Sequence, residues 1–234
     1  MKTLGIIPAR GGSKGIPRKN LADVAGKPMI AYSIETGLEL LRRGALSRCI
    51  VSTDDREIAE TARGLGADVP FMRPAELATD TAKSIDFVRH ALDALEAAGE
   101  AYDAVMLLQP TSPIRDPGRI ADAAARFAAG SADSLISCYR EDYVNDLVMY
   151  AGTPDGHLQP RNPKHNQGVR RQDHGATFVR NGAVYLTRVP YLRRTGQLVC
   201  DRPLLLEMRK IDSIGVDNLD DLELLRAVLC RSAS

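Results

Sequence analysis

The sequence predicts one α/β domain, residues 1–234, with a mostly parallel sheet flanked by helices. Short apolar runs alternate with amphipathic stretches along the chain, which is the pattern of a parallel sheet covered by helices. A chain of 234 residues can bury one substantial core, which favours a single domain with an embedded lobe over two independent domains. A glycine-rich basic segment directly follows the first apolar run, so we expect a ligand site at that edge of the sheet.

Five short apolar runs are the predicted strands. The first begins close to Met1 and leads into the glycine-rich segment, and each of the others follows an amphipathic stretch. The runs cover Thr3–Pro8, Arg48–Ser52, Val69–Arg73, Ala104–Leu108 and Ser134–Cys138.

Five amphipathic stretches carry apolar residues at helical spacing, and we assign these stripes to the core. Pro28 can open the first helix, and Asn218 with Asp221 three residues later provides a capping pair for the last. The helices cover Pro28–Arg42, Arg56–Arg63, Ser84–Ala98, Pro117–Ala129 and a final helix that begins at Asn218.

Residues 141–177 break this alternation. They are rich in Pro, Gly, Asn, Asp and His, and they fit no further strand–helix repeat. A loop-rich segment of this length inside a compact domain is usually functional or reaches toward a partner. It has too few apolar residues for its own core, so we expect an embedded lobe that packs across a two-fold axis in a homodimer.

Charge and composition exclude several functions. The net charge is +1, from 31 basic and 30 acidic residues, so no global field would hold nucleic acid or an anionic membrane. The chain has neither a signal-peptide pattern nor an apolar run near the roughly twenty residues of a membrane span, so we expect a cytoplasmic protein. Four widely separated cysteines, without a C-x-x-C pair, favour reduced thiols over a metal or disulfide role: Cys49, Cys138, Cys200 and Cys230.

The segment Ile7–Asn20 is the strongest functional signal. Its glycines let backbone N–H groups turn toward an anion, and it carries four cations, Arg10, Lys14, Arg18 and Lys19. The spacing fits neither the Walker A loop, which needs Gly-Lys-Ser/Thr, nor the G-x-G-x-x-G dinucleotide loop. A polyphosphate is therefore the expected ligand, and a ligand-free basic surface loop is the alternative.

This segment resembles the N-terminal signature of the acylneuraminate cytidylyltransferases, the CMP-sialic acid synthetase family. Later segments resemble that family's further motifs in the same order, over nearly the whole chain: Ser52–Asp55, Arg73–Asp80, Leu107–Arg115, Arg171–Asp173 and Asn181–Tyr185. The resemblance implies a Rossmann-like nucleotidyltransferase fold. It also implies that residues 141–177 form a small dimerisation lobe that reaches over the neighbouring active site.

The resemblance further implies a reaction and its CTP site. A sugar hydroxyl attacks the α-phosphorus of CTP, which requires cations on the phosphates, a metal and a pocket for the base. Arg73 and Ser84 match the positions that read cytosine, whereas a salt-bridged surface arginine and a helix cap are the alternatives. The implied CTP-binding residues are Arg10, Gly11, Gly12, Ser13, Lys19, Asn20, Arg73 and Ser84, and the implied catalytic residues are Arg10, Lys19 and Asp217.

A sugar-acid site is implied beside it. Gln109 ends a predicted strand, at the edge where open α/β sheets bind ligands. An arginine in this pocket would grip the carboxylate of the sugar acid. By resemblance the site uses Gln109, Arg171, Gln172, Asn181 and Tyr185, although Tyr185 could equally be a half-buried strand aromatic. None of the four histidines is assigned to catalysis, and His90 is expected on a helix surface.

One departure concerns the metal. The family's signature carries two aspartates, whereas this chain has Gly215 and Asp217, so the first metal carboxylate is absent. Asp217 alone could hold Mg²⁺, because this ion commonly takes one or two carboxylates plus phosphate oxygens and water. The alternatives are that Asp212 or Asp221 moves in, that the substrate carboxylate completes the shell, or that the protein is weak or inactive.

These observations predict a cytidylyltransferase that converts CTP and a 3-deoxy-2-keto nonulosonic acid into a CMP-sugar and pyrophosphate, with Mg²⁺ and inversion at phosphorus. Sialic acid, legionaminic acid and related nine-carbon acids are not separable from this sequence. An eight-carbon, Kdo-type enzyme and a non-catalytic nucleotide- or sugar-acid-binding protein are the alternatives.

Overall fold

A computed structural model describes residues 1–166 and 175–232. Its main sheet has six strands in the order β10-β6-β9-β5-β1-β4. β1 pairs in parallel with β4 and β5, and β10 pairs in parallel with β6, whereas β9 is antiparallel to both of its neighbours. The mostly parallel sheet flanked by helices is therefore confirmed. The strands of this sheet are β1 (Thr3–Pro8), β4 (Arg48–Ser52), β5 (Ala104–Leu108), β6 (Ser134–Glu141), β9 (Thr177–Arg188) and β10 (Leu204–Met208).

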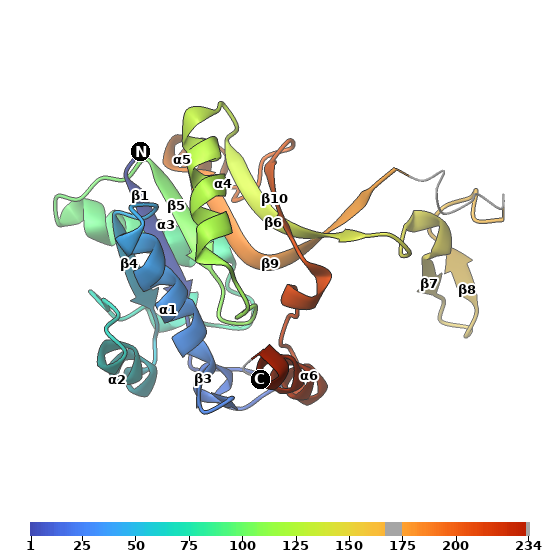
Figure 1. Ribbon diagram of the computed structural model, residues 1–234, viewed down its shortest axis with the longest axis horizontal. Coiled ribbons are helices and arrows are strands. Elements are labelled where there is room, and N and C mark those ends of the chain that lie inside the picture. The colour runs from blue at the N-terminus through green and yellow to red at the C-terminus, as the bar shows by residue number, and fades with distance from the viewer. Residues whose placement is uncertain (167–174, 233–234) are drawn as a thin grey trace.

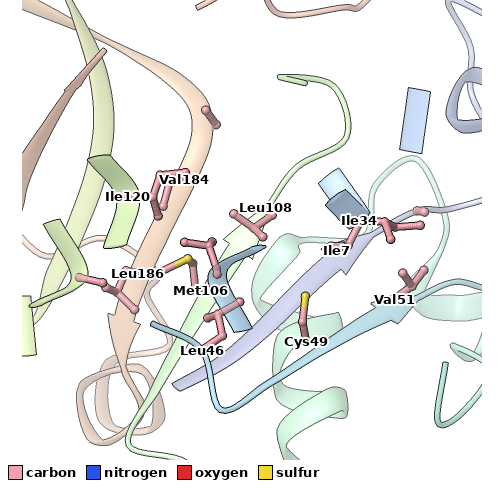
Figure 2. Close-up of a cluster of buried hydrophobic side chains, with 14 of the residues drawn as sticks. Ile7, Ile34, Leu46, Cys49, Val51, Met106, Leu108, Ile120, Val184 and Leu186 are labelled. Atoms are coloured by element: carbon pink, nitrogen blue, oxygen red, sulfur yellow. The ribbon is translucent and has the colours of Figure 1, made fainter. Parts of the chain in front are cut away.

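Helices cover both faces of the sheet (Figure 1). One core cluster joins the sheet to α1, α2 and α4, and a second joins the opposite face to α3 and α5. In β5 the alternation is complete, since Met106 and Leu108 belong to the first cluster and Val105 and Leu107 to the second. Figure 2 shows the first cluster. The helices are α1 (Met29–Arg42), α2 (Arg56–Gly64), α3 (Ser84–Ala97), α4 (Pro117–Ala129), α5 (Val189–Thr195) and α6 (Leu219–Ser232).

A third, smaller cluster fixes the C-terminal segment to the N-terminal loop. Leu222 and Leu225 of α6 pack with Ile16 and Val24, and Val216 joins them as a fully buried residue. The short hairpin of β2 (Asp23–Val24) and β3 (Lys27–Pro28) lies in the same region and leads into α1. Segments that lie about two hundred residues apart in the chain are thus held side by side.

The predicted strands differ from the observed ones. Residues 69–73 form no strand, and Met72 makes only an isolated bridge to Thr53, next to that of Asp68 with Ile50. The sheet is instead completed by β9 and β10, which were not predicted as strands. β9 contains Asn181 and Gly182, and Gly182 has a positive φ of 75°, so a turn-like sequence is accommodated inside a strand beside a register shift in β6.

The described residues 141–166 and 175–177 form an arm that projects from one end of the sheet (Figure 1). β6 and β9 lead into it, and it carries the short antiparallel pair β7 (Tyr150–Gly152) and β8 (Leu158–Pro160). At its base the buried Glu141 accepts hydrogen bonds from the backbone N–H of Tyr143 and from Lys210 Nζ. This part of the chain, expected to be rich in loops, therefore contains two short strands.

Two further properties bear on the sequence analysis. Within the described residues no helix is long and apolar enough to span a bilayer. Among the cysteines, Cys49 and Cys138 are buried, Cys200 is half-buried and Cys230 is exposed.

Candidate active site

The candidate site is a cavity of about 320 Å³ at the carboxyl edge of the sheet. Its walls come from the segments that follow β1 and β5, from the start of α3 and from Asp217. The chain passes from β1 to β4 on one side and returns to β5 on the other, so the cavity lies where the strand order reverses. This is where open α/β sheets bind ligands.

Most of the predicted site residues line this one cavity. They are Arg10, Gly12, Ser13, Lys19, Asn20, Arg73, Ser84, Gln109 and Asp217. Gly11, Asn181 and Tyr185 do not belong to the lining. Arg171 and Gln172 lie outside the described residues.

The glycine loop is shaped by the acidic segment after β4. The N–H of Gly11 donates to Asp54 Oδ1 at 2.9 Å, and a Cβ on Gly11 would lie 2.7 Å from a carboxylate oxygen of Asp55. Gly11 therefore supports the loop from behind. Arg18, whose φ is 55°, pairs with Asp55 and Glu57. Its charge is directed to the start of α2, so Arg18 does not act in the cavity as the sequence suggested.

The same loop is fastened to the C-terminal segment. A Cβ on Gly15 would lie 2.1 Å from the carbonyl oxygen of Asp217, so only glycine permits this approach. Lys19 Nζ donates to the carbonyl of Val216 at 2.8 Å and lies 3.3 Å from Asp217 Oδ1. The N–H of Val216 donates to the carbonyl of Thr111 at 2.8 Å. These contacts hold Asp217 against the glycine loop.

Asp217 lies in a segment without regular secondary structure. Residues 214–217 form neither a strand nor a helix. The Asp217 side chain is 86% exposed and borders the cavity. Gly215 has open space where a Cβ would lie, and its φ is outside the left-handed region.

The two alternative metal carboxylates are engaged elsewhere. Asp221 Oδ2 accepts from the backbone N–H groups of Asp217 and Asn218 at 2.8 and 3.1 Å, and thereby caps α6. Asp212 forms a two-point ion pair with Arg209. Asp217 is left as the carboxylate of this segment that borders the cavity.

Arg73 and Ser84 form a second wall of the cavity. Arg73 is only 5% exposed, its Nε donates to Ser52 Oγ at 3.0 Å, and its guanidinium lies 4.5 Å over the ring of Phe87. Burial lowers the pKa of Arg73 to about 10. Ser84 is the first residue of α3, and Lys83 occupies the N-cap position. Arg73 is thus a buried, oriented donor and not a salt-bridged surface residue, and Ser84 is not the helix cap.

Gln109 is positioned by Arg115, a half-buried arginine that sequence reasoning had not assigned. Arg115 donates from Nε to the carbonyl of Ala183 at 2.9 Å and from Nη2 to the carbonyl of Gln109 at 2.5 Å. Burial lowers the pKa of Arg115 to about 9. Tyr185 borders the same region, because its hydroxyl and Gln109 Oε1 lie 3.9 and 3.4 Å from the position of a Cβ on Gly182.

Asn181 uses its side chain within the protein. Its Oδ1 accepts from Ser137 Oγ at 2.6 Å and from the N–H of Ala183, and its Nδ2 donates to Ser213 Oγ at 2.9 Å and to Met208 Sδ. It therefore ties β6, β9 and β10 to the segment that leads to Asp217. This geometry places Asn181 behind the site, where it positions other residues.

Sequence reasoning missed two features of this region. Asp80, which lines the cavity, pairs with Arg10 Nη1 at 2.7 Å and with Lys14 Nζ at 3.1 Å. It belongs to the Arg73–Asp80 motif, but the motif gave no sign of which cations it would meet. His90, expected on a helix surface, is half-buried with its ring 4.9 Å from that of Phe71, and its Nδ1 is buried without a hydrogen-bond partner among the described residues.

Comparison with known proteins gives a consistent result. A cytidylyltransferase family profile matches residues 4–200. A pseudaminic acid cytidylyltransferase of Campylobacter jejuni is 36% identical over 185 residues, which cover 79% of this chain and 78% of that protein. An N-acylneuraminate cytidylyltransferase of Escherichia coli is 32% identical over 228 residues, which cover 95% of this chain and 51% of that protein.

A solved structure supports the fold. A CMP:2-keto-3-deoxy-manno-octonic acid synthetase complexed with CTP has a TM-score of 0.72 at 19% identity, over 99% of this chain and all of that one. The family match contains the glycine loop, Arg73 and Gln109, so it covers the three main walls of the cavity. The chain belongs to the cytidylyltransferase family.

Proposed function

We propose that this cytidylyltransferase activates a nonulosonic sugar acid with CTP and releases pyrophosphate. The observation that carries the proposal is the single cavity that joins the glycine loop, the buried Arg73 and Asp217. A nucleoside triphosphate needs cations for its phosphates and an oriented donor for its base, and this cavity contains both.

The substrate class is inferred from the relatives. Those at 36% and 32% identity are named for pseudaminic acid and N-acylneuraminate, and a 43% identical stretch of 120 residues belongs to a CMP-N,N'-diacetyllegionaminic acid synthase of Legionella pneumophila. The synthetase of 2-keto-3-deoxy-manno-octonic acid shares the fold at only 19% identity. These findings favour a nine-carbon acid over the eight-carbon alternative.

The chemistry follows from the charges around the cavity. The sugar hydroxyl oxygen forms a bond to the α-phosphorus and loses its proton, and the bond from that phosphorus to the oxygen of the leaving pyrophosphate breaks in line. Negative charge builds on the leaving group, where Arg10 and Lys19 supply positive charge at the cavity wall. Arg73 and Ser84 orient the base, and Gln109 and Tyr185 contact the sugar acid in this proposal.

Mg²⁺ is the cofactor that the residues can accept. Asp217 offers an exposed carboxylate at the cavity, although the described residues contain no group of three or more His, Cys, Asp and Glu side chains that could hold a metal. One carboxylate suffices for an ion that takes its other ligands from phosphate oxygens and water. Bound there, Mg²⁺ would neutralise phosphate charge as it develops.

The arm supports a homodimer. It exposes several large apolar side chains, a feature that usually marks an interaction surface. We infer that a second copy of the chain covers them. They are Tyr143, Val144, Val148, Met149, Tyr150, Leu158 and Phe178, with Tyr143 70% and Leu158 69% exposed. A dimer in light scattering at micromolar concentration is the expected result, and a fully active monomer would contradict this inference.

We also propose that the protein works in the cytoplasm. Cys49, Cys138 and Cys200 form no disulfide, which suits a reducing compartment. Fractionation of cells that express the tagged protein should recover it in the soluble cytoplasmic fraction.

Pyrophosphate release tests the enzymatic proposal. The purified protein is assayed with CTP, UTP, ATP or GTP against sialic, legionaminic, pseudaminic and eight-carbon sugar acids. We expect release with CTP and one of the nine-carbon acids. Preference for the eight-carbon acid would replace the proposed substrate, and CTP binding without release from any acid would favour a non-catalytic binding protein.

A further inference from the structure

We propose that Asp80 competes with the nucleotide's outer phosphates for Arg10 and Lys14. The inference rests on the proposed use of this cavity for a nucleoside triphosphate. It adds a residue that weakens the binding of the outer phosphates and so assists the release of pyrophosphate.

The geometry supports direct competition. Asp80 Oδ1 lies 2.7 Å from Arg10 Nη1, and Asp80 Oδ2 lies 3.1 Å from Lys14 Nζ, so one carboxylate bridges two cations of the glycine loop. Arg10 and Asp80 both line the cavity. A phosphate that bound these cations would occupy the place that the carboxylate takes.

The other loop cations differ in their partners. Arg18 pairs with Asp55 and Glu57, away from the cavity, and Lys19 is held by the Val216 carbonyl beside Asp217. Arg10 and Lys14 are instead paired with Asp80, which lies in the segment before α3. Both pairs are partly exposed, with 35% exposure at Arg10, 80% at Lys14 and 41% at Asp80. Solvent screens such pairs, so a strong anion can displace the carboxylate.

The charge of Asp80 persists at neutral pH. Lys14 and Arg10 hold the pKa of its carboxyl below the ordinary value of 3.8. A polyphosphate brings several negative charges to the two cations, whereas the carboxylate brings one. A nucleotide with a single phosphate has no outer phosphates, so this competition does not affect it. Asp80 therefore weakens the binding of a triphosphate more than that of a monophosphate, and it re-forms its ion pairs as pyrophosphate leaves.

Binding measurements separate this role from a structural one. Dissociation constants for CTP, inorganic tripolyphosphate and CMP are measured by titration calorimetry for the wild type, Asp80→Asn and Asp80→Ala. Loss of the competing charge should tighten tripolyphosphate and CTP about tenfold and change CMP by less than about twofold. If Asp80 only fastened its segment to the glycine loop, both variants would bind tripolyphosphate more weakly. Equal or weaker binding therefore overturns the proposal.

A matched control removes the same charge nearby. Glu76 is exposed on the same segment and is not part of the cavity lining, so Glu76→Gln should leave all three dissociation constants unchanged. An equal gain in Glu76→Gln would assign the effect to overall charge and overturn a specific role for Asp80. Tripolyphosphate carries no cytosine, so tightening of this probe without CTP selectivity would support Asp80 while refuting the proposed nucleotide. Wild-type protein that binds neither probe would refute both.

Discussion

Replacing Gly15 with alanine should disrupt the contact between the glycine loop and Asp217. The new Cβ would lie 2.1 Å from the Asp217 carbonyl oxygen, whereas ordinary van der Waals contact begins at 3.4 Å. The oxygen belongs to the backbone, so no rotamer change relieves the clash. Val216, the preceding residue, is held by Thr111 and Lys19. The loop and this segment must therefore separate by roughly 1 Å or more.

The expected magnitude follows from that displacement. Overpacking of this kind lowers the free energy of unfolding by about 1–3 kcal/mol. For a chain of 234 residues, each kcal/mol lowers Tm by about 2–4 °C, so we expect a fall of about 2–12 °C. A displacement of Asp217 on this scale should also reduce kcat by about a hundredfold.

Gly12→Ala provides the matched control. Gly12 lies in the same loop, but nothing lies within 4 Å of its Cβ position. The free energy of unfolding of the Gly12→Ala variant should differ from that of the wild type by less than about 0.5 kcal/mol. It is measured by thermal and urea unfolding alongside Gly15→Ala. Equal Tm values for Gly15→Ala, Gly12→Ala and the wild type would refute the contact between Gly15 and Asp217.

Three further predictions concern Glu141 at the base of the arm, the positioning residue Asn181, and Gly215 near the proposed metal ligand. The Lys210 ion pair lowers the pKa of Glu141 to about 2, from 4.5, so its stabilisation is present above pH 4.5 and is lost as the pH falls to about 2. The difference in urea-unfolding free energy between wild type and Glu141→Gln should vanish over that interval, and a constant difference would contradict the pairing. Asn181→Ala should lower the free energy of unfolding by about 1–3 kcal/mol. It should also lower kcat by a larger factor than it changes the KM for CTP. A change confined to the KM for the sugar acid would indicate direct contact with the substrate. Gly215→Asp should fold normally and reach half-maximal turnover at lower Mg²⁺, and a large loss of Tm would show that its open Cβ position is wrong.

Local patterns sufficed for much of the fold. β1, β4 and β5 and their flanking helices follow from apolar runs and helical spacing, because both faces of these strands are buried. β9 escaped prediction because Asn181 and Gly182 resemble a turn, and only pairing with β5 and β6 makes this segment a strand. Residues 69–73 have the composition of a strand but make only isolated bridges to the edge strand β4.

Contacts between distant segments explain what the sequence could not predict about the site. The glycine loop was identifiable, yet the direction of Arg18 depends on Asp55 and Glu57. The motif around Asp80 was also visible, but its ion pairs with Arg10 and Lys14 form only in the folded chain, where Asp80 lies against the glycine loop. Such pairings depend on three-dimensional arrangement, and no local spacing encodes them.

Turnover of Asp217→Asn is the most direct test of the proposed active site. Pyrophosphate release from CTP and the preferred sugar acid is measured at limiting Mg²⁺, with Asp220→Asn as a control because this exposed residue lies in the first turn of α6. Loss of the carboxylate should reduce kcat by about two orders of magnitude or more, while the control retains wild-type turnover. Near-wild-type turnover and Mg²⁺ dependence in Asp217→Asn would contradict the assignment of the metal and the reaction to this cavity.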